Sequence, residues 1–201
     1  MSRARTSPDR SLVAELRAAV TDPGQISDRS IDRARLASDA SHFLLTPQLV
    51  ATPADRQDLT GILRVARQRS TPITFRSGGT SLSGQSATTG ILIDTRRHFR
   101  AAEVLDDGRR IRVQPGITLR AANARLAQYG TKLGPDPASE GACTIGGVIA
   151  NNSSGMSCGT EHNAYRTLDS AIVVLPSGTT VDTGARDADA ALRRHEPDLH
   201  E

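Results

Sequence analysis

Residues 76–86, RSGGTSLSGQS, combine three glycines with a series of serine and threonine hydroxyls. Glycine has no side chain that could pack into a core, so such a loop leaves many backbone N–H groups free to donate. Backbone N–H groups and hydroxyls together bind anions, above all phosphate groups. The segment therefore predicts an anion-binding loop, and the alternative is a flexible polar loop at the surface.

Two known phosphate loops fit this segment poorly. The fingerprint Gly-x-Gly-x-x-Gly is absent, because the glycines stand at 78, 79 and 84. The triphosphate loop Gly-x-x-x-x-Gly-Lys-[Ser/Thr] matches residues 79–86 except at Gln85, which replaces the lysine. The sequence that follows, ATTGILIDT, does not predict the required helix. We therefore expect a diphosphate held by backbone N–H groups, in a cofactor that stays bound, with a phosphate-ligand binding module as an alternative.

A second tract of similar character occupies residues 135–155, PDPASEGACTIGGVIANNSSG. Asparagine, serine and glycine are common in turns for local backbone reasons, which is the plainer interpretation of each side chain in the tract. Two such tracts in one chain nevertheless favour a shared role. We expect them to lie in two small lobes, to face each other and to close on one long ligand.

Apolar periodicity and turn residues predict the elements that position these tracts. The clearest helix is residues 52–70, where Thr52 is the expected cap and Asp55 occupies the place of a capping-box acid. Pro115 and Gly116 mark the division between the lobes. Further helices are predicted at 11–20, 27–37, 118–130 and 187–196, strands at 72–75, 90–95 and 109–114, and a hairpin at 170–183.

Composition excludes several classes of function. The 201 residues carry a net charge of +3, and acids are scattered among the arginines, so no basic patch predicts nucleic-acid binding. The scarcity of aromatic residues argues against a stacking platform for single strands. Two cysteines, Cys143 and Cys158, are too few for an iron–sulfur cluster and show no metal-ligand spacing. Without a signal peptide or a membrane span in the sequence, we expect a cytoplasmic protein.

The sequence resembles a known family in these same segments. PITFRSGGTSLSGQS, followed by VQPGITLRAANARLAQYGTKLGPDPASEGACTIGGVIANNSSG, is similar to the PCMH-type FAD-binding domain of the vanillyl-alcohol-oxidase superfamily. Within it, the D-lactate and glycolate branch of FAD-linked 2-hydroxyacid dehydrogenases is the nearest. The resemblance covers roughly residues 36–185 and implies an α+β fold of two small α/β lobes. It divides the chain into a lead-in (1–45), a first lobe (46–114, with the pyrophosphate loop 76–86) and a second lobe (115–201).

The resemblance also implies roles for individual residues. The first loop would wrap the FAD pyrophosphate with backbone N–H groups, and its end would approach the ribityl chain or the flavin. In the second tract, the first positions would line the flavin edge, the middle would form a turn against the cofactor, and the end would reach the adenosine side. The residues so implied are Arg76, Ser77, Gly78, Gly79, Thr80, Ser81, Leu82, Gln85 and Ser86 in the first loop, and Pro135, Asp136, Ser139, Thr144, Gly146, Gly147, Asn151, Ser154 and Gly155 in the second tract.

Departures from the family qualify this interpretation. Several relatives attach flavin covalently through a histidine that follows the Gly-Gly pair, but Thr80 stands there, so we expect FAD to be bound non-covalently. Some relatives have a cysteinyl attachment near Cys143, where a small buried thiol is the expected role here. We expect no metal site.

Relatives continue into a cap domain that shapes the substrate pocket, and we find no segment in this sequence that could be the cap. We therefore expect either the N-terminal cofactor domain of a longer protein or the product of a split or truncated gene. The implied activity is oxidation of a small D-2-hydroxy acid such as D-lactate or glycolate, with an electron acceptor that the sequence does not identify. No motif assigns a base to His42, His98 or His162, so the sequence identifies no catalytic residue. The alternative is a non-catalytic flavin-holding subunit that needs a partner chain carrying the cap.

Overall fold

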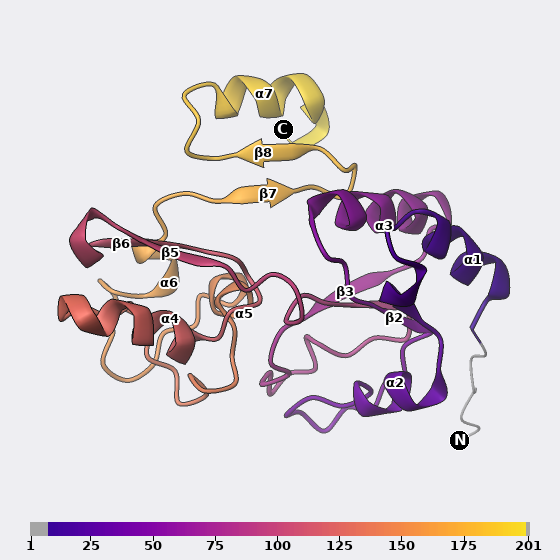
Figure 1. The fold of residues 1–201 in the computed structure, drawn as a ribbon, viewed down its shortest axis with the longest axis horizontal. Helices are drawn as coiled ribbons and strands as arrows, with labels where there is room; N and C mark the ends of the chain where they lie inside the picture. Colours follow the sequence, from indigo (N-terminus) through magenta and orange to yellow (C-terminus); the bar gives the residue numbers. More distant parts are fainter. Residues whose placement is uncertain (1–7, 200–201) are drawn as a thin grey trace.

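The computed structural model describes residues 8–199. Its first part is a four-stranded sheet with helices on both faces (Figure 1). Strand β1 pairs antiparallel with β2, and β2, β4 and β3 are parallel, giving the order β1-β2-β4-β3. The elements of this part are α1 (Arg10–Ala18), a 3-10 turn (Pro23–Gln25), β1 (Ile26–Ser27), α2 (Ser30–Arg35), β2 (Leu49–Ala51), α3 (Arg56–Gln68), β3 (Ile73–Arg76) and β4 (Ile91–Asp94).

The two inner strands of this sheet are apolar on both faces. All residues of β2 are buried, and so is the whole of β4. Leu49, Ala51, Ile91 and Ile93 pack with α1 and α3, while Val50 and Leu92 alternate to the other face and form a small cluster with Leu36. Continuous apolar runs of this kind are typical of parallel strands covered by helices on both sides.

Helix α3 joins β2 to β3 and carries the predicted apolar stripe. Its N-cap is Asp55, whose carboxylate accepts a hydrogen bond from the Asp58 N–H at 2.9 Å. The prediction of Thr52 as the cap is therefore wrong, because the helix begins only at Arg56. Asp58 is 2 % exposed and accepts from the backbone and hydroxyl of Thr21 and from the Ala54 N–H, which ties the helix start to the end of α1.

A second core lies beyond β4. Residues of α4, α5 and α6 and of the turns between them form it, and Ala102, Ile111 and Val113 of a β-hairpin pack against it. The hairpin thus packs with the second core, although our division at 114/115 assigns it to the first lobe; that boundary stays a prediction. The elements are β5 (Ala102–Leu105), a 3-10 turn (Asp106–Gly108), β6 (Arg110–Val113), α4 (Leu119–Leu126), a 3-10 turn (Ala127–Tyr129), α5 (Ile145–Ala150) and α6 (Ala164–Thr167).

The C-terminal part returns toward the first lobe. Strands β7 (Ile172–Val174) and β8 (Thr180–Asp182) form the predicted hairpin, followed by α7 (Ala188–His195) and a 3-10 turn (Pro197–Leu199). Val174 packs against the first core, and in Figure 1 the turn between β7 and β8 lies at the start of α3. Within residues 8–199, no helix is long and apolar enough to cross a membrane.

Candidate functional site

The glycine-rich loop starts where β3 ends, at the carboxyl edge of the parallel strands. Open parallel sheets commonly bind ligands at this edge. The five consecutive backbone N–H groups of residues 78–82 donate no hydrogen bond to any described residue. Gly79 adopts φ 70°, a left-handed conformation that favours glycine and that is common in backbone anion-binding turns. The loop therefore presents the set of free donors that the sequence predicted.

The turn that follows holds itself together. The Ser81 hydroxyl accepts hydrogen bonds from the Ser83 and Gln85 N–H groups and donates to the Gln85 side-chain oxygen at 3.2 Å. Gln85 and Leu82 are exposed, while Ser86 is buried. Thr80 is half-buried.

The second tract contacts this loop directly. The Ser77 and Thr144 hydroxyls lie 2.6 Å apart, and the Thr144 N–H donates to the Ser77 hydroxyl at 3.2 Å. A Cβ placed on Gly78 would lie 2.0 Å from the carbonyl oxygen of Ala142, and one on Gly147 would lie 2.8 Å from the Ser77 oxygen. Glycine at both positions lets the two backbones approach this closely. The expected proximity of the two tracts is confirmed.

Part of the second tract folds on itself. The Asp136 N–H donates to the Ser154 carbonyl at 2.6 Å, and Asp136 forms a parallel bridge with Gly155. The Asp136 carboxylate accepts from the Ser157 N–H; hydrogen bonding from Ser157 lowers the pKa of this carboxyl. The Ser139 carbonyl accepts from the N–H groups of the third and fourth residues after it.

The middle of the second tract is helical, which the sequence reasoning did not foresee. Helix α5 runs through Gly146 and Gly147 because Ile145 and Val148 anchor it in the second core. Gly146 packs against Pro115, where an added Cβ would lie 2.7 Å from the proline Cβ. Asn151 caps the helix at its C-terminal end and is exposed.

Sequence reasoning missed a third segment at the site, residues 36–43. The Ser86 hydroxyl donates to the Asp39 carboxylate at 2.9 Å, the Ala40 N–H donates to the Gly79 carbonyl at 3.0 Å, and Phe43 packs on Gly84. Burial raises the pKa of Asp39, but hydrogen bonds from Ser41 and Ser86 outweigh it, so the pKa lies below its ordinary value. The turn formed by Asp39 and Ser41 was the available sequence signal, since an aspartate often bonds the N–H two residues on.

Arg76 lies behind the loop rather than in it. It is 7 % exposed, and its guanidinium donates to the carbonyls of Leu36, Ser38 and Ser86 at 3.3, 2.9 and 3.4 Å. Burial lowers the pKa of Arg76, the charge of Arg96 lowers it further, and Asp39 and Asp94 act in the opposite direction.

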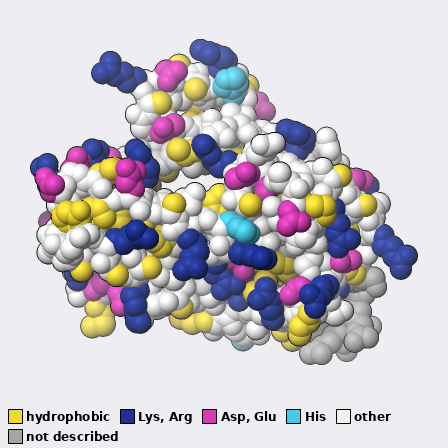
Figure 2. All heavy atoms as spheres, in the orientation of Figure 1, with side chains coloured by type: hydrophobic (Ala, Val, Ile, Leu, Met, Phe, Trp, Pro, Cys, Tyr) yellow, Lys and Arg dark blue, Asp and Glu magenta, His cyan; other side chains and the backbone are white. Residues whose placement is uncertain are grey.

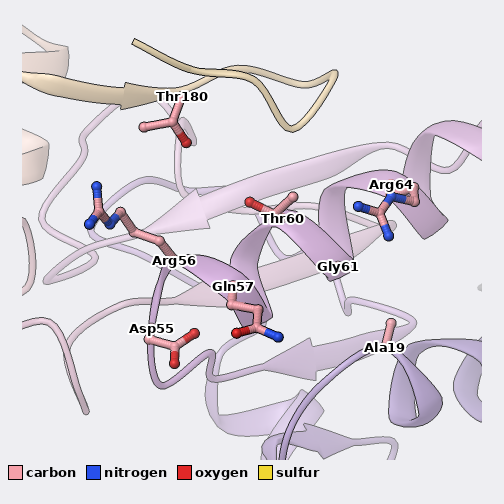
Figure 3. Close-up of a pocket in the computed structure, with 8 residues that line it drawn as sticks. All are labelled: Ala19, Asp55, Arg56, Gln57, Thr60, Gly61, Arg64 and Thr180. Atoms are coloured by element: carbon pink, nitrogen blue, oxygen red, sulfur yellow. The ribbon is translucent and has the colours of Figure 1, made fainter. Parts of the chain in front are cut away.

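Two surface hollows lie away from both tracts. One, of about 650 Å³, is lined by Arg56, Thr60 and Arg64 of α3 and by Thr180 of β8 (Figure 3). A second, of about 550 Å³, lies against α2 and β1. Over the face in Figure 2, basic and acidic side chains are interspersed.

Among the described residues, the side chains of His42, His98 and His162 make no hydrogen bond or ion pair with either tract. His42, His98 and His162 are all exposed, and the His42 ring stacks at a tilt on Phe43. Cys143 is buried in the second core, and burial raises the pKa of its thiol. Among residues 8–199, no cluster of histidine, cysteine or acidic side chains could hold a metal ion.

Comparison with known proteins agrees with this arrangement. A family model described as an FAD binding domain matches residues 47–184, more than half of the chain. The chain belongs to this family of FAD-binding domains. The match includes both glycine-rich tracts and the hairpin β7–β8.

Several curated relatives are similar to this FAD-binding domain. It is 34 % identical over 147 residues to the glycolate oxidase subunit GlcD of Escherichia coli strain K12, covering 68 % of this chain and 30 % of the relative. It is 32 % identical over 164 residues to the D-lactate dehydrogenase of Archaeoglobus fulgidus, covering 74 % and 36 %. The chain thus spans about a third of the length of these two relatives.

Solved structures show the same fold at low sequence identity. An alkyldihydroxyacetonephosphate synthase matches with a TM-score of 0.75 and 22 % identity, covering 92 % of this chain and 37 % of that one. The xylooligosaccharide oxidase from Myceliophthora thermophila C1 matches with a TM-score of 0.73 and 22 % identity, covering 94 % and 38 %. The predicted α+β fold of two small lobes is confirmed.

The residues at the meeting point fit FAD, the cofactor of the family. A diphosphate needs several donors, and residues 78–82 offer consecutive free N–H groups beside the Thr80 hydroxyl. The loop contains no lysine, in keeping with a cofactor that is held rather than hydrolysed.

Proposed function

We propose that this chain is the FAD-binding part of a flavin-dependent dehydrogenase or oxidase that acts on a small D-2-hydroxy acid such as glycolate or D-lactate. The observation that carries the cofactor assignment is the contact of the two tracts beside the free N–H groups of residues 78–82. The substrate class is supported by the names of the relatives, a glycolate oxidase subunit and a D-lactate dehydrogenase.

In this proposal, the backbone of residues 78–82 receives the FAD diphosphate, with the Thr80 hydroxyl as a further donor. Ser77, Thr144 and Gly147 form the base on which the two lobes meet. The segment that joins Asp136 to Ser154 and Gly155, together with Pro135, Ser139, Gly146 and Asn151, forms the second wall. Gln85 and Ser86 lie at the far end of the first loop.

Bound FAD supplies the two-electron acceptor that oxidation of a hydroxyl-bearing carbon requires. The chain's own residues bind and orient the cofactor. The exposed histidines His42, His98 and His162 show no partner that would make one of them a base, so we place the catalytic groups outside these residues. We further propose that FAD is held without a covalent bond, because Thr80 is a poor attachment point and the Cys143 thiol is buried.

The decisive test is an absorbance spectrum of the purified chain before and after addition of FAD, with quenching of FAD fluorescence as the titration. We expect saturable binding and, after acid precipitation, release of all flavin into the supernatant. Flavin that remains with the pellet would refute the non-covalent assignment. A folded chain that ignores saturating FAD but binds ATP with magnesium would refute the cofactor assignment in favour of a phosphate-ligand module.

One observation favours a second candidate, a flavin-holding subunit completed by a partner chain. Ile172 and Val173 of β7 are 55 % and 38 % exposed although they point to opposite faces of the strand. Apolar residues on both faces are typical of a strand that is covered on both sides. If FAD binds but D-lactate and glycolate do not reduce it, while addition of a polypeptide that covers β7 restores reduction, the second candidate is supported.

A further inference from the structure

Arg76 is a buried cation that forms no direct ion pair in the part of the chain that the structure describes. Among the described residues, its guanidinium donates to three carbonyl oxygens, those of Leu36, Ser38 and Ser86. Its Nε is buried and has no hydrogen-bond partner, and no described carboxylate lies within ion-pair distance. An ionised group in such a place is costly unless an opposite charge comes close. The charges of Asp39 and Asp94 favour the ionised form of Arg76, but neither carboxylate forms an ion pair with it, and Asp94 is paired with Arg96.

The guanidinium lies directly against the glycine-rich loop. A Cβ on Gly79 would lie 2.3 Å from the Arg76 Nη2, so only glycine lets the loop backbone rest on the guanidinium. From the opposite segment, the Ala40 N–H holds the Gly79 carbonyl at 3.0 Å. Two of the carbonyls that accept from Arg76 belong to the supporting segment, residues 36–38, and the third belongs to Ser86 at the end of the glycine-rich loop. One side chain thus fixes the loop and the segment that supports it.

We propose that Arg76 is a positioning residue that supports anion binding from behind the loop backbone. It supplies the positive charge that a lysine supplies in triphosphate loops, and it does so without contact with the ligand. The proposal rests on the proposed function, since the anion is the diphosphate of FAD at the N–H groups of residues 78–82. Arginine suits this place because its planar fork can satisfy several carbonyls at once, which the single ammonium of lysine does less well.

The experiment compares two substitutions with a matched control. Arg76→Met removes both the fork and the charge, whereas Arg76→Lys keeps the charge alone. Arg97→Met removes an exposed arginine that lies just beyond β4 and controls for net charge. FAD affinity is measured by fluorescence quenching, and loop order by hydrogen exchange of residues 36–45 and 77–86 without FAD.

We expect R76M to weaken FAD binding roughly a hundredfold and R76K roughly tenfold, the range for lost hydrogen bonds to a charged group. Both should exchange faster than R97M in the two segments. Equal losses in R76K and R76M would overturn the electrostatic part, because a purely structural clamp is not rescued by charge. If R76K and R76M have the same FAD affinity and the same hydrogen-exchange rates as R97M, the whole proposal is overturned while the proposed function stands. If R76M does not fold, the comparison of R76K with R97M decides. Roughly tenfold weaker FAD binding and faster hydrogen exchange in R76K support the proposal, and the absence of any difference overturns it. If the unaltered chain does not bind FAD, the proposed function fails and the ligand assignment of Arg76 fails with it.

Discussion

Gly78→Ala is the substitution that most directly tests the contact between the two tracts. Gly78 does not have a positive φ, so alanine introduces no backbone strain and acts only through its Cβ. That Cβ would lie 2.0 Å from the Ala142 carbonyl oxygen and 2.7 Å from its carbon, both backbone atoms that cannot rotate away. The loops must therefore separate.

The size of the effect follows from these distances. Raising 2.0 Å to the 3.4 Å of ordinary van der Waals contact requires a shift of about 1.4 Å. A shift of that size along the line between the loops stretches the 2.6 Å contact of Ser77 with Thr144 to about 4.0 Å and breaks it. Overpacking costs about 1–3 kcal/mol and the lost hydrogen bond about 1 kcal/mol, so we expect a loss of about 2–4 kcal/mol.

The assay is thermal unfolding together with FAD titration. For a chain of this size, the loss corresponds to a fall in Tm of roughly 5–15 °C, and FAD binding should weaken at least about tenfold. Gly141→Ala is the matched control, because its Cβ would meet only the end of the Arg120 side chain, which is 69 % exposed and can move. If G78A and G141A have the same Tm and the same FAD affinity, the inferred contact between the tracts does not exist as described.

Three further predictions concern buried groups. Asp58→Asn should lower the free energy of unfolding by about 1–3 kcal/mol at pH 7, because the carboxylate receives hydrogen bonds from Thr21. Burial raises the pKa of Asp58, but the hydrogen bonds outweigh burial and the pKa of the folded state lies below 3.8. The stabilisation is therefore fully present above pH 3.8 and disappears as the pH falls through the pKa of the folded state. Denaturation at pH 7 and at a pH below 3.8 should show the free energies of unfolding of wild type and variant converging, and a difference that stays constant would contradict the assignment. Thr144→Val keeps the shape but removes the hydroxyl bonded to Ser77. A double-mutant cycle with Ser77→Ala should give a coupling energy of about 0.5–1.5 kcal/mol in the free energy of unfolding, whereas additive effects would count against a direct bond. Cys143 should react with a thiol reagent only after unfolding, because burial raises its pKa; rapid labelling of the native chain would show that the second core is open.

Much of the fold could be predicted because its signals are local. The apolar stripe of α3, the buried run of β4 and the glycine that ends the segment after α4 in a left-handed conformation are each encoded within a few turns of chain. Short elements were missed for the same reason: β1 and β2 have two and three residues, too few to show a period. Helix α5 was missed because Gly146 and Gly147 are poor helix formers, and only the packing of Ile145 and Val148 stabilises it.

The sequence by itself predicted two glycine-rich tracts without a lysine and favoured a shared ligand for them, because that prediction depends only on residue types and their spacing. Only the tertiary structure decided how the tracts meet. Ser77 and Thr144 are 67 residues apart, and Arg76 reaches Ser38 over a separation of 38. Such contacts depend on how helices and sheets pack, and local periodicity does not predict which distant carbonyl accepts a hydrogen bond from a buried guanidinium.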